Sequence, residues 1–195
     1  RYLQDALSIA QSGDEIWVAQ GTYQTDRGVG ITSGDRTKSF ALESGVAVYG
    51  GFNGFETLLS QRNPTQNTTI LSGDLLNDDG PNFGNYSENA FHVVVGGGAD
   101  STAVLDGFTI TAGGANLVNG TDHLGGGIQI LNGSPTISNC RIVANRTQTG
   151  GGAFVFPGSP TFSNCLFADN SALRGGGMYN NDGAAPVIIK CTFLN

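Results

Sequence analysis

The chain has 195 residues, of which 31 are glycine and only 13% are charged, and its formal net charge is −7. Average usage would give about half as many glycines, but no G-X-Y period is present, which excludes a collagen-like chain. The negative charge and the lack of a basic stripe exclude nucleic acid as the expected partner. No apolar run approaches the ~18 residues of a membrane-spanning helix, so no transmembrane segment is expected.

The chain is expected to begin with a short helix, over residues 1–12. Leu3, Ala6, Leu7 and Ala10 lie on one face when this stretch is drawn as a helix. A repeat protein with open strand edges needs a cap at its end. We therefore predict that this helix covers the first turn of a repeat structure.

Residues 13–124 are predicted to form less regular coils of the same kind. The segment LDGFTI (105–110) aligns with ISNCRI (137–142) at a spacing of 32 residues, which implies an inserted loop at 116–124. Short apolar stretches flanked by turn residues predict further strands. These strands are expected at 15–19, 46–49, 70–74 and, around His92, at 90–94.

The longest irregular stretch, residues 75–89, is predicted to be a loop. Four oxygen-bearing side chains stand at its start, ahead of Gly80: Asp74, Asn77, Asp78 and Asp79. Hard cations such as Ca²⁺ prefer oxygen ligands of this kind, although the spacing does not match an EF-hand. The hypothesis is a Ca²⁺ site made by these four residues. The alternative is a solvated acidic turn held by Asx hydrogen bonds.

Three Gly-Gly-Gly triplets mark an internal repeat. They stand at 125–127, 150–152 and 175–177, and each is followed by a proline, a cysteine and an apolar residue in nearly the same register. The first two units have 25 residues each, and the third carries one extra residue before Pro186. A triplet and a proline in every unit exclude helical repeats, and the unit is too short for a propeller blade.

The columns of this repeat predict which side chains face inward. Cys140 and Cys165 align with Cys191, and the residue two places after each cysteine is apolar, so both are expected inside. We expect buried free thiols, with a disulfide or a metal as alternatives, because parallel side-chain vectors suit a disulfide poorly. Asn139 and Asn164 are expected at a corner, because asparagine tolerates the left-handed conformation. Lys190 interrupts this asparagine column.

These segments resemble known families. LQDALSIAQSGDEIWVAQGTY (3–23), VYGGFNGFE (48–56), ILSGDLLNDDG (70–80) and ENAFHVV (88–94) resemble pectin-lyase-like right-handed β-helix proteins of bacterial surfaces. The GGG…SNC…N units resemble the repeat of chlamydial-type polymorphic outer-membrane proteins. The resemblance implies a fold that carries lyases, hydrolases, adhesins and inert stalks.

The predicted fold is therefore all-β: a right-handed parallel β-helix, a solenoid of about 25 residues per coil, with a short N-terminal capping helix. We expect a single domain over 1–195 and regular coils over 125–195. Because the chain starts at Arg1 and ends within a repeat, we expect it to be a piece of a longer protein.

The functional expectation is a non-catalytic protein, secreted or at the cell surface, acting as adhesin, stalk or scaffold. The carboxylates and basic residues that the resembled lyases and hydrolases bring together are not found as a set in the sequence. A chain of stacked coils with open edges also favours assembly with itself. The alternative is a protein that binds or degrades extracellular polysaccharide, for which Trp17, Tyr49, Tyr86 and Tyr179 offer stacking rings.

Overall fold

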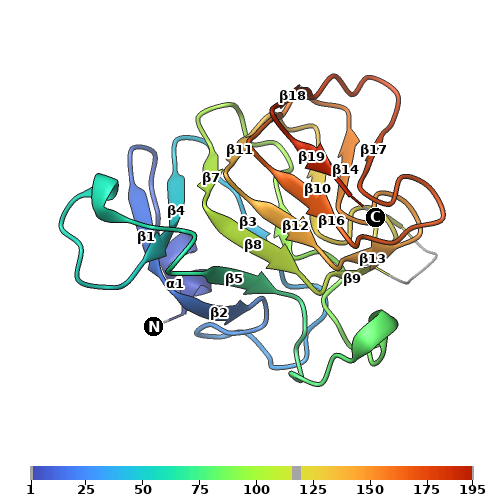
Figure 1. Ribbon diagram of the computed structural model, residues 1–195, viewed down its shortest axis with the longest axis horizontal. Coiled ribbons are helices and arrows are strands. Elements are labelled where there is room, and N and C mark those ends of the chain that lie inside the picture. The colour runs from blue at the N-terminus through green and yellow to red at the C-terminus, as the bar shows by residue number, and fades with distance from the viewer. Residues whose placement is uncertain (1, 116–119, 195) are drawn as a thin grey trace.

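The computed structural model describes residues 2–115 and 120–194. Within them, regular structure consists of short strands in parallel sheets and a single α-helix, α1 (Leu3–Leu7) (Figure 1). The predicted all-β class with parallel strands is confirmed. Two 3₁₀ turns, at Leu59–Gln61 and Pro81–Phe83, interrupt the longer connections.

Three sheets make up most of the molecule. The first contains β1 (Glu15–Ala19), β4 (Ala47–Phe52), β7 (Val104–Asp106), β11 (Thr136–Ser138), β15 (Thr161–Ser163) and β18 (Val187–Ile189), in that order. The second contains β2 (Gly21–Gln24), β5 (Thr69–Ser72), β8 (Phe108–Thr111), β12 (Arg141–Val143), β16 (Leu166–Ala168) and β19 (Thr192–Phe193). The third contains β3 (Phe40–Ala41), β6 (Val94–Val95), β10 (Ile128–Leu131), β14 (Ala153–Phe156) and β17 (Met178–Asn180).

The chain visits these sheets in a fixed cyclic order, first, second, third and then first again. Every strand of these three sheets except the last one in each, β17, β18 or β19, therefore pairs with the strand that occupies the same place one repeat later, and all of these pairs are parallel. A small additional sheet, made of β9 (Gly114–Ala115) and β13 (Arg146–Thr147), lies between the second and third sheets in chain order. This small sheet carries part of the candidate site.

The register predicted from the repeat is confirmed. Ile137 pairs with Leu105 on one side and with Phe162 on the other. In the second sheet, Ile142 lies between Ile110 and Phe167 in the same way. The side chains of these columns are almost fully buried, and they form the core together with Cys140 and Cys165.

The cysteines are free thiols, as expected, and Cys140 and Cys165 are buried. Burial raises the pKa of the Cys165 thiol to about 12, so at neutral pH it stays protonated and unreactive. Cys191, in the last repeat, is only partly buried, because no strand of the described residues covers β19 on its far side.

The glycine triplets stack directly on one another. The main-chain N–H groups of Gly150, Gly151 and Gly152 donate to the carbonyl oxygens of Arg174, Gly175 and Gly176 at 2.9, 3.1 and 2.9 Å. A Cβ added at Gly152 would lie 2.4 Å from the carbonyl oxygen of Gly177. The triplets are therefore the places where successive repeats approach too closely for any side chain.

The corner predicted at the asparagine column is confirmed. Asn139 and Asn164 have φ values of 53° and 51°, in the left-handed region. Lys190 stands at the same corner with φ 52°, so the last repeat keeps the backbone shape although it loses the asparagine. A second left-handed corner follows the second sheet, at Ala112, Ala144 and Asp169.

Several predicted boundaries differ from the structure, among them those of the strands expected at 46–49 and 70–74, which are β4 and β5. The helix expected over 1–12 is confined to α1, where Leu3 is buried against the core. The strand expected at 90–94 begins only at Val94, because His92 and its neighbours hydrogen-bond as an irregular segment. Of the insertion predicted at 116–124, residues 116–119 lie outside the described part, residues 120–123 form turns, and Leu124 forms a parallel bridge with Thr149.

Candidate functional site

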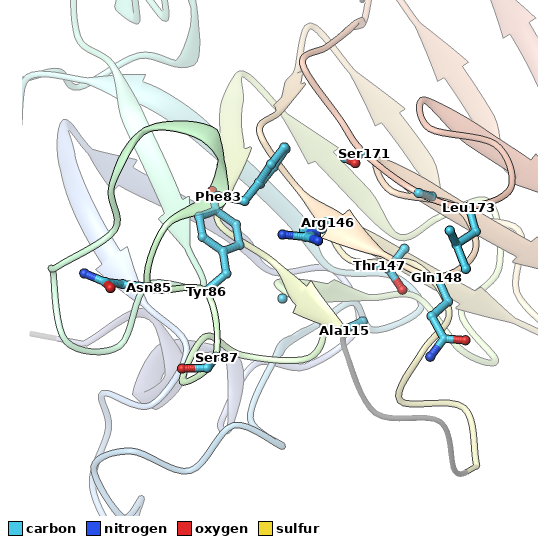
Figure 2. A pocket seen from close by; sticks show the side chains of 12 residues that line it. Phe83, Asn85, Tyr86, Ser87, Ala115, Arg146, Thr147, Gln148, Ser171 and Leu173 are labelled. Atoms are coloured by element: carbon cyan, nitrogen blue, oxygen red, sulfur yellow. The ribbon is translucent and has the colours of Figure 1, made fainter.

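A groove of about 660 Å³ lies where the loop predicted at 75–89 faces the small sheet of β9 and β13. Its two sides come from parts of the chain far apart in sequence (Figure 2). The lining residues are Phe83, Asn85, Tyr86, Ser87, Gly114, Ala115, Arg146, Thr147, Gln148, Ser171, Ala172 and Leu173.

The floor of the groove is made of small residues for a packing reason. Gly114 donates its N–H to the carbonyl oxygen of Ala90 at 2.8 Å, and a Cβ there would meet Asn89 Cβ at 2.8 Å. The neighbouring Ala115 is fully buried. The loop returns to the body of the molecule at this point and packs against Gly114, so a larger side chain does not fit there. The groove lies in front of these small residues.

One wall of the groove is aromatic. The Phe83 and Tyr86 rings meet edge to face with centroids 5.1 Å apart. The Tyr86 hydroxyl donates to the carbonyl oxygen of Ala144 at 2.8 Å, which anchors the loop on the second corner. Burial raises the pKa of this hydroxyl, so it stays protonated and keeps donating.

Arg146 supplies a positive charge in the middle of the groove. Its guanidinium lies 5.6 Å from the centre of the Phe83 ring. Figure 2 shows it between the aromatic side chains of the loop and the side chains of Gln148 and Leu173 opposite. The groove thus combines ring faces, a cation and amide and hydroxyl groups that donate and accept hydrogen bonds.

The backbone of this loop is held in uncommon conformations. Asn82, Phe83 and Asn85 have φ values of 56°, 61° and 64°. Asparagine tolerates this region, but a positive φ at an aromatic residue is rare and costs energy. Such conformations gather at binding and catalytic sites, and here one of them sets the direction of the aromatic wall.

The acidic residues of the same loop lie together behind this wall. One ligand atom of each of Asp74, Asp78, Asp79 and Glu88 lies within 4.8 Å of the others. The structure therefore brings together three of the four predicted Ca²⁺ ligands. Asn77, the fourth, is exposed at φ 56° in the turn between them.

Glu88 was missed by sequence reasoning. It stands at the far end of the loop, ten residues after Asp78, and no ligand motif has that spacing. Only the fold of the loop, which returns its end to its beginning, places the Glu88 carboxylate beside Asp74. An acidic residue at each end of a long predicted loop is the one signal that could have suggested it.

Burial shapes the electrostatics of the cluster. It raises the pKa of Asp79 to about 7; the amide of Asn89 opposes this shift, and the charges of Asp74, Glu88 and Asp78 add to it. Burial also raises the pKa of Glu88. Both pKa values rise for the same main reason: the carboxylates are partly removed from water, which disfavours their charged form.

The aromatic residues suggested from sequence as sugar platforms divide into two groups. Trp17 stacks on Phe52 with centroids 4.8 Å apart, and Tyr179 stacks on Phe154 at 6.0 Å. Tyr49 lies under the guanidinium of Arg62. Only Tyr86 lies in the groove, where Phe83, which the sequence did not single out, joins it.

Comparisons with protein-family models, with curated proteins and with solved structures return no match. Among the residues the structure describes, no helix is long and apolar enough to span a membrane.

Proposed function

We propose that this chain is a right-handed parallel β-helix that works outside the cell or on its surface as a non-catalytic scaffold, and that its groove holds an extended polysaccharide. The cyclic order of the three parallel sheets and the 25-residue stacking support the β-helix. Parallel strands joined by crossovers are right-handed in nearly all proteins, which supports the handedness.

The observation that carries the binding function is the composition of the groove. A sugar ring presents apolar C–H faces and an edge of hydroxyl groups. Phe83 and Tyr86 offer aromatic surface to such a face, and Asn85, Gln148 and Ser171 line the same space with amides and a hydroxyl. The groove is open rather than enclosed by a lid, which suits a long chain that extends beyond it.

Binding is better supported than hydrolysis. Cleavage of a glycosidic bond is ordinarily carried out by a pair of carboxylates that flank it. The described residues that line the groove include no Asp or Glu, whereas Arg146 can pair with a carboxylate of an acidic sugar. A lyase, which would use a base such as arginine on a uronate, is the catalytic alternative.

The test is a panel of neutral polysaccharides and polyuronates, followed by titration calorimetry on those that bind. We expect Phe83→Ala and Arg146→Ala each to weaken binding about tenfold, which corresponds to ~1.4 kcal/mol. Phe55→Ala is the matched control, because Phe55 is an exposed aromatic outside the groove.

Two results would contradict the proposal. Binding that survives both groove substitutions would place the ligand elsewhere. If no polysaccharide of the panel binds, the proposed binding function is refuted and only the scaffold role remains. Unsaturated products appearing in the polyuronate samples would favour the lyase alternative instead.

A further inference from the structure

The acidic cluster contains buried oxygen atoms that lack any hydrogen-bond donor. Asp79 Oδ1 and both carboxylate oxygens of Glu88 are shielded from solvent, and none has a hydrogen-bond partner. The main-chain amides of Glu88 and Leu76 lie near the Glu88 carboxylate and oppose the rise of its pKa by burial, but neither forms a hydrogen bond with it. Buried charges of this kind are ordinarily paired or bound to a metal.

Asn89, a fully buried neutral residue next to the cluster, also has an oxygen atom without a hydrogen-bond partner. Asn89 is 0% exposed, and its Nδ2 donates to Asp79 Oδ2 at 2.9 Å and to the carbonyl oxygen of Ala112 at 2.8 Å. Its Oδ1 is buried and has no partner. Asn89 therefore adds an unsatisfied amide oxygen, held beside the carboxylates by its own side-chain hydrogen bond.

Arg36 is the protein's own cation that feels this group, because the charge of Glu88 opposes the lowering of its pKa by burial, but one positive charge does not balance four carboxylates. Over residues 2–115 and 120–194, the ion pairs join Arg27 to Asp26, Lys38 to Asp35, and Arg62 to Asp106. The cluster keeps four carboxylates within 4.8 Å of one another, and such a group is repulsive unless protons or an external cation compensate it.

We propose that Asp74, Asp78, Asp79 and Glu88 bind one Ca²⁺ ion, with the Asn89 amide oxygen beside them, and that the ion fastens the aromatic wall of the groove. Asp74 and Glu88 stand at the two ends of the loop, so a shared ion closes it. Phe83 and Tyr86 lie on the segment between them. The proposed effect of the ion on the groove rests on the proposed polysaccharide binding, whereas the proposed Ca²⁺ site does not.

The ligand set favours Ca²⁺ over Mg²⁺. Several carboxylates and an amide oxygen on an irregular loop suit the six to eight flexible oxygen contacts that Ca²⁺ takes. Mg²⁺ demands a nearly ideal octahedron and keeps most of its water, so a cluster of this size on a loop would bind it less well.

The test of the metal site is calorimetric titration of CaCl₂ into protein stripped with EDTA, together with melting curves. We expect saturable 1:1 binding and a Tm that rises with CaCl₂ and returns on adding EDTA. Asp79→Asn and Glu88→Gln should each weaken Ca²⁺ binding at least tenfold, while the exposed Glu43→Gln should not change it. MgCl₂ in place of CaCl₂ should give weaker binding.

No binding heat and no Tm shift up to about 10-millimolar CaCl₂, which is about ten times the weakest dissociation constant of extracellular calcium modules, would overturn the site. So would Asp79→Asn and Glu88→Gln variants that fold, by circular dichroism, and bind Ca²⁺ as wild type does.

The coupling is read separately, by titrating the bound polysaccharide with and without CaCl₂. Weaker polysaccharide binding in EDTA for wild type, but no effect of EDTA on Glu88→Gln, supports the coupling. Ca²⁺ binding without any polysaccharide binding keeps the metal site and refutes the proposed function. Polysaccharide binding that EDTA does not alter refutes the coupling alone.

Discussion

At the residue scale, the repeat is determined by positions where a side chain is either forbidden or required. The glycine triplets belong to the first kind. Asn145 belongs to the second: it is fully buried, its Nδ2 donates to the carbonyl oxygen of Ile110 at 3.0 Å, and its Oδ1 accepts from the N–H of Gly113 at 2.9 Å. At each of these positions, the space and the main-chain hydrogen-bonding groups of the neighbouring repeat determine which residue type fits.

The substitution Gly152→Ala tests the stacking of the triplets. Its Cβ would lie 2.4 Å from the Gly177 carbonyl oxygen, so the repeats must move apart, and we expect a loss of about 1–3 kcal/mol of unfolding free energy. Gly80→Ala is the control, because its Cβ would have no neighbour closer than 3.8 Å. Urea unfolding of the two variants measures the free energy of unfolding that each loses. Equal losses for Gly152→Ala and Gly80→Ala would contradict close stacking as the reason for the triplets.

The sequence was sufficient to predict the backbone corners, but not which pair of stacked asparagine amides makes the shorter hydrogen bond. Asn139 and Asn164 were placed at a corner correctly, yet their amides are 3.5 Å apart and exposed. The shorter contact, 3.0 Å, joins Asn145 to Asn170 at the next corner. Both asparagine pairs have the same spacing of 25 residues, so periodicity alone does not tell which of them is buried.

At the element scale, the segment before the first glycine triplet is fastened to the body by a histidine. His92 Nδ1 lies 2.9 Å from the Gly125 carbonyl oxygen, which assigns the proton to this nitrogen. His92 Nε2 is then left to accept from Gln129 Nε2 at 3.1 Å. The Gln129 amide also reaches the carbonyl oxygens of Thr121 and Leu124 at 3.0 and 3.1 Å.

This arrangement predicts a dependence of stability on pH. Burial lowers the pKa of His92, and His123 adds to the shift, while the Gly125 carbonyl and Asp122 oppose it. A folded-state pKa below the unfolded value of about 6.5 means that the contribution is complete above pH ~6.5 and is lost as the pH falls toward the folded-state pKa. Once protonated, Nε2 of His92 can no longer accept the hydrogen bond from the Gln129 amide, and the two donors face each other.

The measurement is urea unfolding at pH 7.5, 6.5 and 5.5 (chosen to bracket the unfolded pKa of about 6.5). We expect wild type to lose stability over this interval relative to His92→Gln, which does not titrate. The control variant His123→Gln, which removes the other histidine of the chain, should lose stability over this interval as wild type does. Parallel pH profiles for wild type and His92→Gln would show that the buried imidazole is not responsible.

The groove could not be predicted at this scale. Phe83 and Arg146 are far apart in the chain, and they meet only because β9 and β13 pair and the loop from 74 to 89 returns over them. The acidic half of the site was largely predictable, since Asp74, Asp78 and Asp79 are close in sequence. Local spacing reveals a ligand cluster within one loop, but not a groove built between repeats.

At the scale of the whole molecule, the two ends differ. Leu3 of α1 packs against the core at one end. At the other end, Val187, Ile188 and Ile189 of β18 are exposed, and no strand of the described residues pairs beyond them. An apolar edge strand is a template for pairing with another strand, so in the 195-residue chain this edge is where we expect the predicted self-assembly.

Self-assembly is tested by light scattering over a range of protein concentrations. We expect concentration-dependent association that Val187→Lys abolishes, because a charge on an edge strand opposes edge pairing. Val29→Lys, which changes a more exposed valine outside β18, should leave association intact. A monomer at every concentration would refute self-assembly through this edge.

The most direct test of the account is a crystal structure of the protein with an oligosaccharide of the polysaccharide that binds best, grown with CaCl₂. The account predicts sugar density along the groove, with a ring on Phe83 and Tyr86 and polar contacts to Arg146 and Gln148, and one ion among Asp74, Asp78, Asp79 and Glu88. Sugar bound on another face, with the groove empty, would contradict it.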